Sequence, residues 1–251
     1  MEPYVKTETH NGITSIEFFH PQSNSLPQNL LHKLAAAITH AGEDPNTIVI
    51  ILRSAGESAF CAGASFDELV AIQNEEEGLK FFSGFAQVIN AMRTCPKFII
   101  GRIQGKCVGG GVGLAASVDY AIAAVSAEVK LSELAVGIGP FVVGPAVERK
   151  IGNSAFSQLA INATLWSTAD WARRKGLYAE VYPEITGMDE AIHRLANVLM
   201  HSSPEAMAEM KKIFWQGTEN WDKLLIERAA ISGRLVQSDF TKKAIEKFKA
   251  T

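Results

Sequence analysis

The hydrophobic pattern at the start of the chain predicts a β-hairpin followed by a helix. Tyr4–Thr9 and Ile13–Phe19 alternate or run apolar on either side of Asn11-Gly12, a dipeptide typical of tight hairpin turns. His20-Pro21 ends the second strand, and apolar residues then recur at helical spacing over Asn29–Ala41. We therefore expect a hairpin that leads into a helix with one apolar face.

Two units of buried strand, loop and helix are predicted next. Ile48–Leu52 and Lys97–Ile103 are mostly branched apolar runs, as in strands that are buried on both faces. The first strand leads into the loop Ser54–Phe66, either a ligand-binding loop or a plain connection, and into an amphipathic helix at Gly78–Met92. We interpret the phenylalanines of this helix as core. The second strand enters the glycine triplet 109–111, which predicts a turn from strand to helix.

The rest of the pattern is mainly helical. We expect a strand at Tyr178–Tyr182 and helices at Pro140–Ile151, Asn153–Thr164, Ser167–Lys175 and, divided by Pro204 and Gly217, Met188–Ala250. Ser167 and Asp170 predict a capping box for the third of these helices, and Gly176 predicts its end. We divide the chain into a core at 1–186 and a helical oligomerisation region at 187–251.

Composition narrows the functional classes. The chain has 251 residues, of which 47% are hydrophobic, and a net charge of -3 with both signs interspersed, so we expect no nucleic-acid partner. No apolar run approaches the ~20 residues that span a bilayer, and MEPYVKTETHNG is too polar for a signal peptide, so we expect no membrane association and a cytoplasmic location. The three cysteines lack metal-ligand spacing and fit free thiols in a reducing compartment.

The glycine-rich stretch GKCVGGGVG does not match the nucleotide-binding patterns. Lys106 precedes the glycines instead of following them as in a phosphate loop, and Leu114 stands where the dinucleotide pattern requires its last glycine. The six histidines never cluster at ligand spacing, so we predict no metal site. A serine nucleophile is also not indicated, because the chain lacks the G-x-S-x-G elbow.

One carboxylate follows the glycine triplet in an apolar setting. Glu133 lies between leucines in LSELAVG, where burial should raise its pKa. The triplet offers backbone N–H groups to an anion, or to an oxygen that becomes one during a reaction. A donor pocket and a poised base together predict chemistry through an enolate.

Four stretches together resemble the enoyl-CoA hydratase/isomerase (crotonase) family. They are FCAGA at Phe60–Ala64, PKFIIGRIQGKCVGGGVGLAASVDYAIA at Pro96–Ala123, SELAVGIGP at Ser132–Pro140 and RKGLYAEVYP at Arg174–Pro183. The resemblance implies an α/β fold, a crotonase-like spiral of repeated β-β-α units with a C-terminal helical trimerisation region. It also implies a homo-oligomer, a trimer or a hexamer of two trimers, that acts on acyl-CoA.

The resemblance also implies roles for particular residues. The backbone N–H groups of Ala64 and Gly110 would form the oxyanion hole for the thioester carbonyl, with Glu133 as the acid/base. No prosthetic group is implied, since coenzyme A enters as part of the substrate. The residues implied to border coenzyme A are Cys61, Ala62, Gly63, Ala64 and Ser65. Lys97, Lys106 or a lysine of a neighbouring subunit could meet the coenzyme A phosphates, with a solvated charge as the alternative.

Departures from the family pattern bear on the reaction. Hydratases of this family carry a glutamate just beyond the glycine triplet, where this chain has Gly113. A bulky apolar pair, Pro140-Phe141, is similar to that of the monofunctional isomerases and would line a dry acyl pocket with Gly113, or else fill core. We therefore favour isomerisation of 3-enoyl-CoA to 2-enoyl-CoA. The alternatives are a hydratase, lyase or hydrolase that uses Glu133 alone, and a non-catalytic acyl-CoA-binding homologue.

Overall fold

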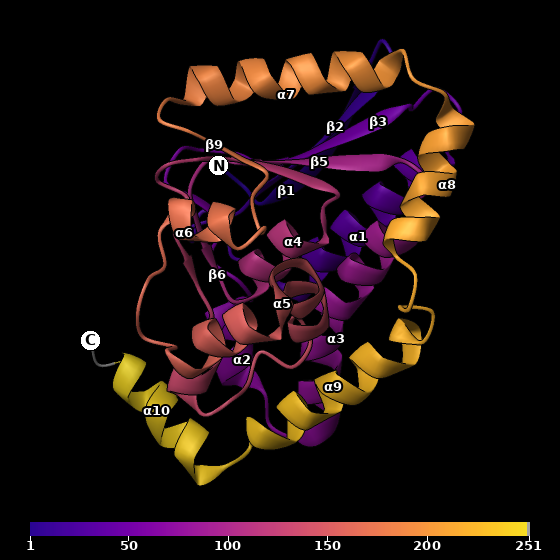
Figure 1. The fold of residues 1–251 in the computed structure, drawn as a ribbon. Coiled ribbons are helices and arrows are strands. Elements are labelled where there is room, and N and C mark those ends of the chain that lie inside the picture. The colour runs from indigo at the N-terminus through magenta and orange to yellow at the C-terminus, as the bar shows by residue number, and fades with distance from the viewer. Residues whose placement is uncertain (250–251) are drawn as a thin grey trace.

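The computed structural model describes residues 1–249, and its strands form two sheets (Figure 1). The six-stranded sheet has the order β1-β2-β3-β5-β7-β9, and the three-stranded sheet has the order β4-β6-β8. The strands of the large sheet are β1 Tyr4–His10, β2 Ile13–Phe19, β3 Val49–Ser54, β5 Phe98–Ile103, β7 Tyr120–Ala124 and β9 Glu180–Tyr182. The strands of the small sheet are β4 Ala59–Cys61, β6 Lys106–Val108 and β8 Val129–Lys130.

The strand pairing confirms the expected hairpin and shows that the rest of each sheet is parallel. β1 and β2 pair antiparallel, from Tyr4 opposite Phe19 to His10 opposite Ile13, and Asn11 and Gly12 both have positive φ in the turn. All the other neighbouring strands pair parallel. Parallel neighbours need crossover connections, and these connections hold the helices and the site.

Eleven helical elements accompany the strands in the described part of the chain. They are α1 Gln28–Glu43, α2 Phe66–Ala71, α3 Glu75–Thr94, α4 Gly110–Ser117, the 3-10 turn η1 Glu133–Val136, α5 Gly144–Ile161, α6 Ala169–Arg174, α7 Ile185–Met200, α8 Pro204–Phe214, α9 Trp221–Leu235 and α10 Asp239–Lys249. In Figure 1, α7 lies along one face of the large sheet, with α1 and α3 on the opposite side. Met188 and Ile192 of α7 pack on Val49, Ile100 and Ile122 of that sheet.

The chain repeats one β-β-α unit three times. A strand of the large sheet is followed each time by a strand of the small sheet and then by a helical element: β3-β4-α2, β5-β6-α4 and β7-β8-η1. This arrangement is the expected crotonase-like spiral. Because β4, β6 and β8 are parallel neighbours, the loops at their carboxyl ends meet at one edge of the small sheet.

Three of the differences from the prediction have a local cause. α2 was not expected, although Ser65 and Glu68 have capping-box spacing, and the Ser65 hydroxyl accepts a hydrogen bond from the Glu68 N–H at 3.3 Å. The Ser167 cap is wrong, because Thr168 caps α6 through the Trp171 N–H at 3.1 Å while Ser167 bridges to Val129.

The third difference concerns the two helices expected after residue 140. They are merged in α5, which begins at Gly144 and is broken at Gly152, where φ is +75°.

The last four helices wrap around the core. α9 packs closely on α3, since a Cβ at Gly78 would lie 2.7 Å from the Gly233 Cα. α10 packs on η1, because a Cβ at Gly137 would lie 2.5 Å from the Thr241 Oγ1. The predicted boundary at residue 187 stays a prediction, and Ala250 lies outside the described residues. None of the described helices combines the length and apolar character that crossing a membrane requires.

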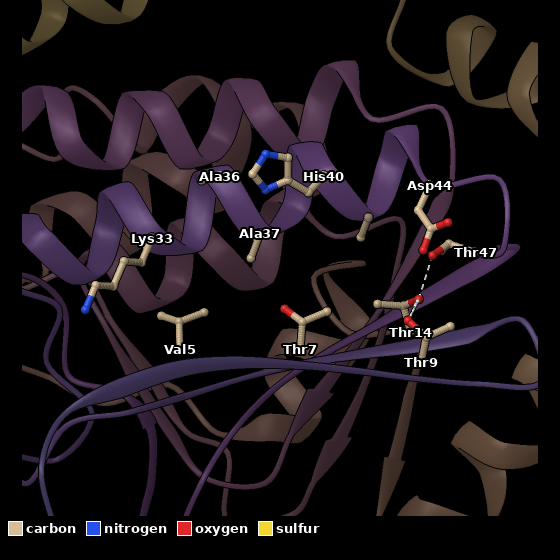
Figure 2. Close-up of a pocket in the computed structure, with 11 residues that line it drawn as sticks. Val5, Thr7, Thr9, Thr14, Lys33, Ala36, Ala37, His40, Asp44 and Thr47 are labelled. Carbon is tan, nitrogen blue, oxygen red and sulfur yellow. Dashed lines mark hydrogen bonds between the residues drawn. The ribbon is translucent and has the colours of Figure 1, made fainter.

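A surface groove of about 500 Å³ lies between α1 and the β1-β2 hairpin (Figure 2). Its floor carries a chain of hydroxyls, in which Thr14 lies 2.9 Å from Thr9 and 2.6 Å from Thr47. Lys33 and His40 of α1 line the opposite wall. None of the lining residues belongs to the loops at the edge of the small sheet, so this groove is separate from the candidate site.

Candidate active site

Two loops approach each other at the carboxyl edge of the small sheet. The loop after β4 carries Gly63 at φ +91°, and the loop after β6 carries Gly109 at φ +51°. A Cβ at Gly63 would lie 3.0 Å from the Val108 carbonyl oxygen and 3.4 Å from the Gly110 nitrogen. Glycine at 63 and 109 therefore allows both the turns and the close approach.

The N–H groups of Ala64 and Gly110 are available beside these turns. Leu26 pairs with the residues on either side of Ala64, since its N–H donates to Gly63 at 2.8 Å and its carbonyl accepts from Ser65 at 3.3 Å. Gly110 is the first residue of α4, where N–H groups have no partner within the helix. Neither amide is a donor in the hydrogen bonds found among residues 1–249 outside regular helix and strand pairing. Both residues border one cavity.

Each glycine of the triplet faces a different close neighbour. A Cβ at Gly109 would lie 3.0 Å from the Glu133 Oε1, and one at Gly111 would meet the Cys61 carbonyl oxygen. A Cβ at Gly110 would meet the ring of Phe85. Packing therefore requires glycine at 110 and 111, and at 109 the positive φ of the turn favours glycine as well.

Glu133 begins η1 and points its carboxyl group at the glycine turn. The Glu133 backbone carbonyl accepts a hydrogen bond from Ile138 at 3.0 Å, and Gly137 ends the turn with φ +80°. The Oε2 atom is buried and has no hydrogen-bond partner among the described residues. Burial raises the pKa of Glu133 to about 7, partly offset by a hydrogen bond from its own backbone. A carboxyl group with this pKa can take up and return a proton near neutral pH.

The cavity between these groups has a volume of about 450 Å³ and mainly apolar walls. Phe81, Phe82 and Phe85 of α3 line one side, and Val142 and Val143 line another. The expectation that the α3 phenylalanines are core is incomplete, since Phe81 and Phe85 are buried in the structure and also border this cavity. Such walls exclude water from a reacting centre and keep the Glu133 carboxyl group in a low-dielectric setting.

Val143 occupies the space next to Gly113. A Cβ at Gly113 would lie 2.5 Å from Val143 Cγ1 and 2.8 Å from Val143 Cβ. Gly113 itself is buried and is not part of the cavity wall, although we predicted it as a pocket residue. A glutamate at position 113 could enter the site only if Val143 were replaced or displaced.

The other predicted site residues divide into two groups. Ala62, Gly63, Ala64, Pro140 and Phe141 border the cavity.

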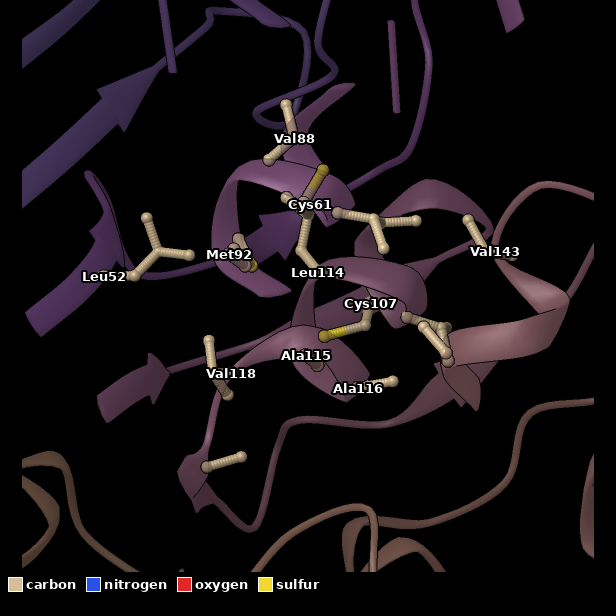
Figure 3. Close-up of a cluster of buried hydrophobic side chains, with 14 of the residues drawn as sticks. Leu52, Cys61, Val88, Met92, Cys107, Leu114, Ala115, Ala116, Val118 and Val143 are labelled. Atoms are coloured by element: carbon tan, nitrogen blue, oxygen red, sulfur yellow. The ribbon is translucent and has the colours of Figure 1, made fainter. Parts of the chain in front are cut away.

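Cys61 and Ser65 belong to the second group, away from the cavity wall. The Cys61 side chain lies in the core near Cys107 and Leu114 (Figure 3), where burial raises its pKa to about 12, and Ser65 caps α2. Only their backbone could border coenzyme A in the manner that the resemblance implies.

The sequence analysis gave no role to four polar residues of the cavity wall, which are Lys130, Ser132, Thr164 and Ser232. Lys130 reaches the wall from β8, and Ser232 reaches it from α9. Lys130 lies three residues before Glu133, so its nearness to the predicted base is a local signal that was available. The contribution of α9 depends on its packing on α3, which no local pattern gives.

No group of three His, Cys, Asp or Glu side chains among residues 1–249 is placed to hold a metal ion.

A comparison with known protein families identifies the family that has this fold. The family model for Enoyl-CoA hydratase/isomerase matches residues 8–250, nearly the whole chain. The chain belongs to the enoyl-CoA hydratase/isomerase family. This agrees with the resemblance drawn from the four sequence stretches.

Curated relatives carry hydratase and dehydratase names. The mitochondrial methylglutaconyl-CoA hydratase of Mus musculus is 32% identical over 200 residues, which cover 78% of this chain and 63% of that protein. The carnitinyl-CoA dehydratase of Escherichia coli is 29% identical over 211 residues, which cover 82% of this chain and 78% of that protein. The chain thus spans less than two thirds of the mouse relative's length.

Solved structures of this family share the fold. An enoyl-CoA hydratase from Bacillus halodurans aligns with a TM-score of 0.90 at 23% identity, covering 97% of this chain and 99% of that one. An enoyl-CoA hydratase/isomerase from Xanthobacter autotrophicus Py2 aligns with a TM-score of 0.88 at 22% identity, covering 98% and 93%. At these identities the likeness establishes the crotonase fold and leaves the reaction open.

Proposed function

We propose that this protein is an acyl-CoA isomerase that converts 3-enoyl-CoA to 2-enoyl-CoA with Glu133 as its single base. The Glu133 carboxylate takes the proton from C2, and the C–H electron pair moves toward the thioester carbonyl to form an enolate. When the carbonyl re-forms, the double bond shifts to C2=C3, and C4 takes the proton back from Glu133. Protons and electrons balance within the substrate and one carboxyl group.

The N–H groups of Ala64 and Gly110 would stabilise the enolate oxygen. Both border the cavity beside Glu133, and both belong to turns fixed by packing. Dipoles that are already oriented do not have to reorganise as charge develops, and one such donor is typically worth about 3 kcal/mol in the transition state. The substrate is then bound as its coenzyme A thioester, with no separate prosthetic group.

The observation that carries this proposal is the Gly113–Val143 contact. Hydration of a double bond is favoured by two acid/base groups, one for the water and one for the α-proton. The space that a second carboxylate would need at position 113 is filled by Val143. Glu133 is the one Asp or Glu on the cavity wall among residues 1–249. Glu128 pairs instead with Lys106 at 3.2 Å, and Glu148 accepts a hydrogen bond from Asn153 at 3.0 Å.

The direct test is incubation with a 3-enoyl-CoA and detection of the conjugated 2-enoyl thioester by its ultraviolet absorbance. We expect product with the wild type and a loss of about 10²–10⁴-fold in Glu133→Gln, the usual contribution of a general base. Glu148→Gln is a matched control away from the cavity and should keep the wild-type rate. Absence of product, or an undiminished rate in Glu133→Gln, would reject the proposal.

Exchange of α-protons into heavy water distinguishes catalysis from binding alone. Saturated acyl-CoA should exchange its C2 protons in the presence of wild-type protein and not with Glu133→Gln. Tight binding of acyl-CoA without any exchange in the wild type would instead favour a non-catalytic acyl-CoA-binding homologue.

A second candidate is hydration of 2-enoyl-CoA with Glu133 alone, because relatives at 32% and 29% identity are named as a hydratase and a dehydratase. Mass spectrometry of the product from a 2-enoyl-CoA separates the two reactions, since hydration adds one water and isomerisation leaves the mass unchanged. Hydration at a rate comparable to isomerisation would make this the better description.

We also propose that the protein assembles as a homotrimer or as a hexamer of two trimers. Large apolar side chains are exposed on α7 and α8, among them Val198, Ile213 and Phe214. Exposed apolar surface of this kind is typical of interfaces. Light scattering coupled to size-exclusion chromatography tests the state, and a monomer at micromolar concentration would contradict it.

A further inference from the structure

Lys130 is a cation on the wall of a mainly apolar cavity. It belongs to β8, and its backbone carbonyl accepts a hydrogen bond from the Gly109 N–H at 2.9 Å. The residue is partly buried, and it borders the same cavity as Glu133. This bond fixes the β8 backbone directly beside the glycine turn and the proposed thioester site.

The ammonium group of Lys130 is held against an indole ring. Lys130 Nζ lies 4.4 Å from the ring centroid of Trp166, and Lys106 Nζ lies 4.5 Å from the same centroid. Trp166 is kept beside β8 because Ser167 and Val129 exchange backbone hydrogen bonds at 2.9 Å. Such contacts with an aromatic face position a cation without neutralising its charge.

The charges in this corner do not balance. Lys106 has a partner in Glu128, whose Oε2 lies 3.2 Å away. Among residues 1–249, no carboxylate lies within ion-pair distance of Lys130. Glu133 does not serve as the partner, because no cation contributes to its pKa. Lys130 therefore borders the cavity as a cation that has no carboxylate partner among the described residues.

We propose that Lys130 binds a second carboxylate at the far end of the acyl group, so that the substrates are thioesters of short dicarboxylic acids. This deepens the proposed function and relies on its placement of the thioester at Ala64 and Gly110. The Cα atoms of Lys130 and Glu133 are three residues apart, a span of at most about 11 Å. A short acyl chain that starts at the thioester carbonyl and the lysine side chain together can bridge a separation of this size.

The phosphates of coenzyme A are the other source of anionic oxygen. They are separated from the thioester by the whole pantetheine arm, whereas Lys130 is bonded through its backbone to the turn that precedes Gly110. A distal carboxylate is therefore the better match to its position. A contact with the nucleotide would affect every acyl-CoA equally, and this difference decides the test.

The experiment measures dissociation constants by titration calorimetry for glutaryl-CoA and valeryl-CoA. The two have acyl chains of equal length and differ in a terminal carboxylate or methyl group, and both are saturated and cannot isomerise. Lys130→Met should weaken glutaryl-CoA binding about tenfold or more, the value of a charge-assisted hydrogen bond, and leave valeryl-CoA binding nearly unchanged. Lys130→Arg should retain most of the glutaryl-CoA affinity.

Lys33→Met is a matched control, since it removes a lysine from the separate groove beside α1 and should change neither constant. Equal weakening of both ligands by Lys130→Met would place the cation on coenzyme A and overturn the proposal, as would no change with either ligand. If Lys130→Met fails to fold, Lys130→Gln provides the same comparison.

The readout does not depend on turnover. Loss of isomerase activity with intact discrimination between the two ligands would reject the proposed reaction alone. Isomerase activity without discrimination would reject the dicarboxylic substrate alone.

Discussion

Gly109 and Gly113 both lie near the start of α4, yet one faces a polar side chain and the other an apolar one. Gly109 faces the carboxyl group of Glu133, and Gly113 faces the isopropyl group of Val143. The first contact leaves an ionisable group with a buried oxygen, and the second fills the corresponding space with hydrocarbon. The comparison teaches that packing, as well as the presence of a carboxylate in the sequence, sets how many carboxylates can enter the cavity.

The largest effect is expected when Gly113, which faces Val143, is replaced by glutamate. Gly113→Glu overlaps Val143 and buries a second acid, so we expect a loss of about 3–5 kcal/mol in the free energy of unfolding. Val143→Gly added to Gly113→Glu should recover much of this loss, since even an alanine Cβ at 143 would lie 2.8 Å from a Cβ at 113. Denaturant titration measures both.

The same double variant also tests whether a second carboxylate changes the reaction. With carboxylates at 113 and 133, hydration of 2-enoyl-CoA should rise above the wild-type level. The single variant Val143→Gly is the control, because it opens the space without adding an acid. If Val143→Gly alone hydrates as well as the double variant, water access rather than a second base limits the reaction.

The next effect concerns Glu133, whose contribution to stability depends on pH. The pKa of Glu133 is raised from 4.5 to about 7, so the folded state holds this proton more tightly than the unfolded chain. Stability from this group is complete below pH 4.5, falls as pH rises to about 7, and stays reduced above it. Glu133→Gln should therefore be more stable than wild type at pH 8, by up to about 3 kcal/mol.

Thermal or urea denaturation at pH 4.5 and pH 8 measures this difference, which should be small at the lower pH. The pH profile of kcat/KM is an independent readout, since a base must be deprotonated: activity should be half-maximal near pH 7 and level off about one pH unit above it. A Glu133→Gln protein no more stable than wild type at pH 8 would contradict burial as the cause of the raised pKa.

A smaller effect tests the donor between the two positions. Gly110→Ala places a methyl group on the ring of Phe85 and should shift the N–H from the thioester oxygen. We expect about 1–3 kcal/mol of destabilisation and a loss in kcat. Phe85→Leu should be the compensating partner, and a double variant no better than Gly110→Ala would show that the ring is not the obstacle.

The smallest effect is expected at α6, which does not line the cavity and serves as a reference. Thr168→Ala removes the cap of α6 and should lower the free energy of unfolding by about 1 kcal/mol without changing kcat. Ser167→Ala is the matched control, because Ser167 pairs through its backbone and should be nearly neutral. If Ser167→Ala were the more destabilising of the two variants, Ser167 would be the cap, as the sequence pattern predicts.

The local parts of the site could be predicted from the sequence. Glycine at 109–111 indicates a turn, and an acid between leucines indicates a buried carboxyl group. The structure has the turn at this position and buries the Glu133 Oε2 atom. The hairpin and the buried strands follow from the hydrophobic pattern, and the spiral follows from the resemblance to the family.

The remaining parts depend on contacts between distant segments. That Gly113 stands behind Val143, that Phe85 presses on Gly110 and that Ser232 reaches the cavity from α9 are consequences of how helices pack. The short strands β4, β6 and β8 were hidden in loops because two or three residues carry no periodicity. Ser65 illustrates the limit, since a polar residue beside a predicted ligand loop proves to be a helix cap.

The contact between Gly137 and Thr241 has a consequence for the order in which the protein can mature. The turn that carries Glu133 is synthesised long before α10, yet α10 packs against that turn. A nascent chain that has completed the two sheets still lacks this support. This turn should therefore reach its final packing only after α10 has left the ribosome.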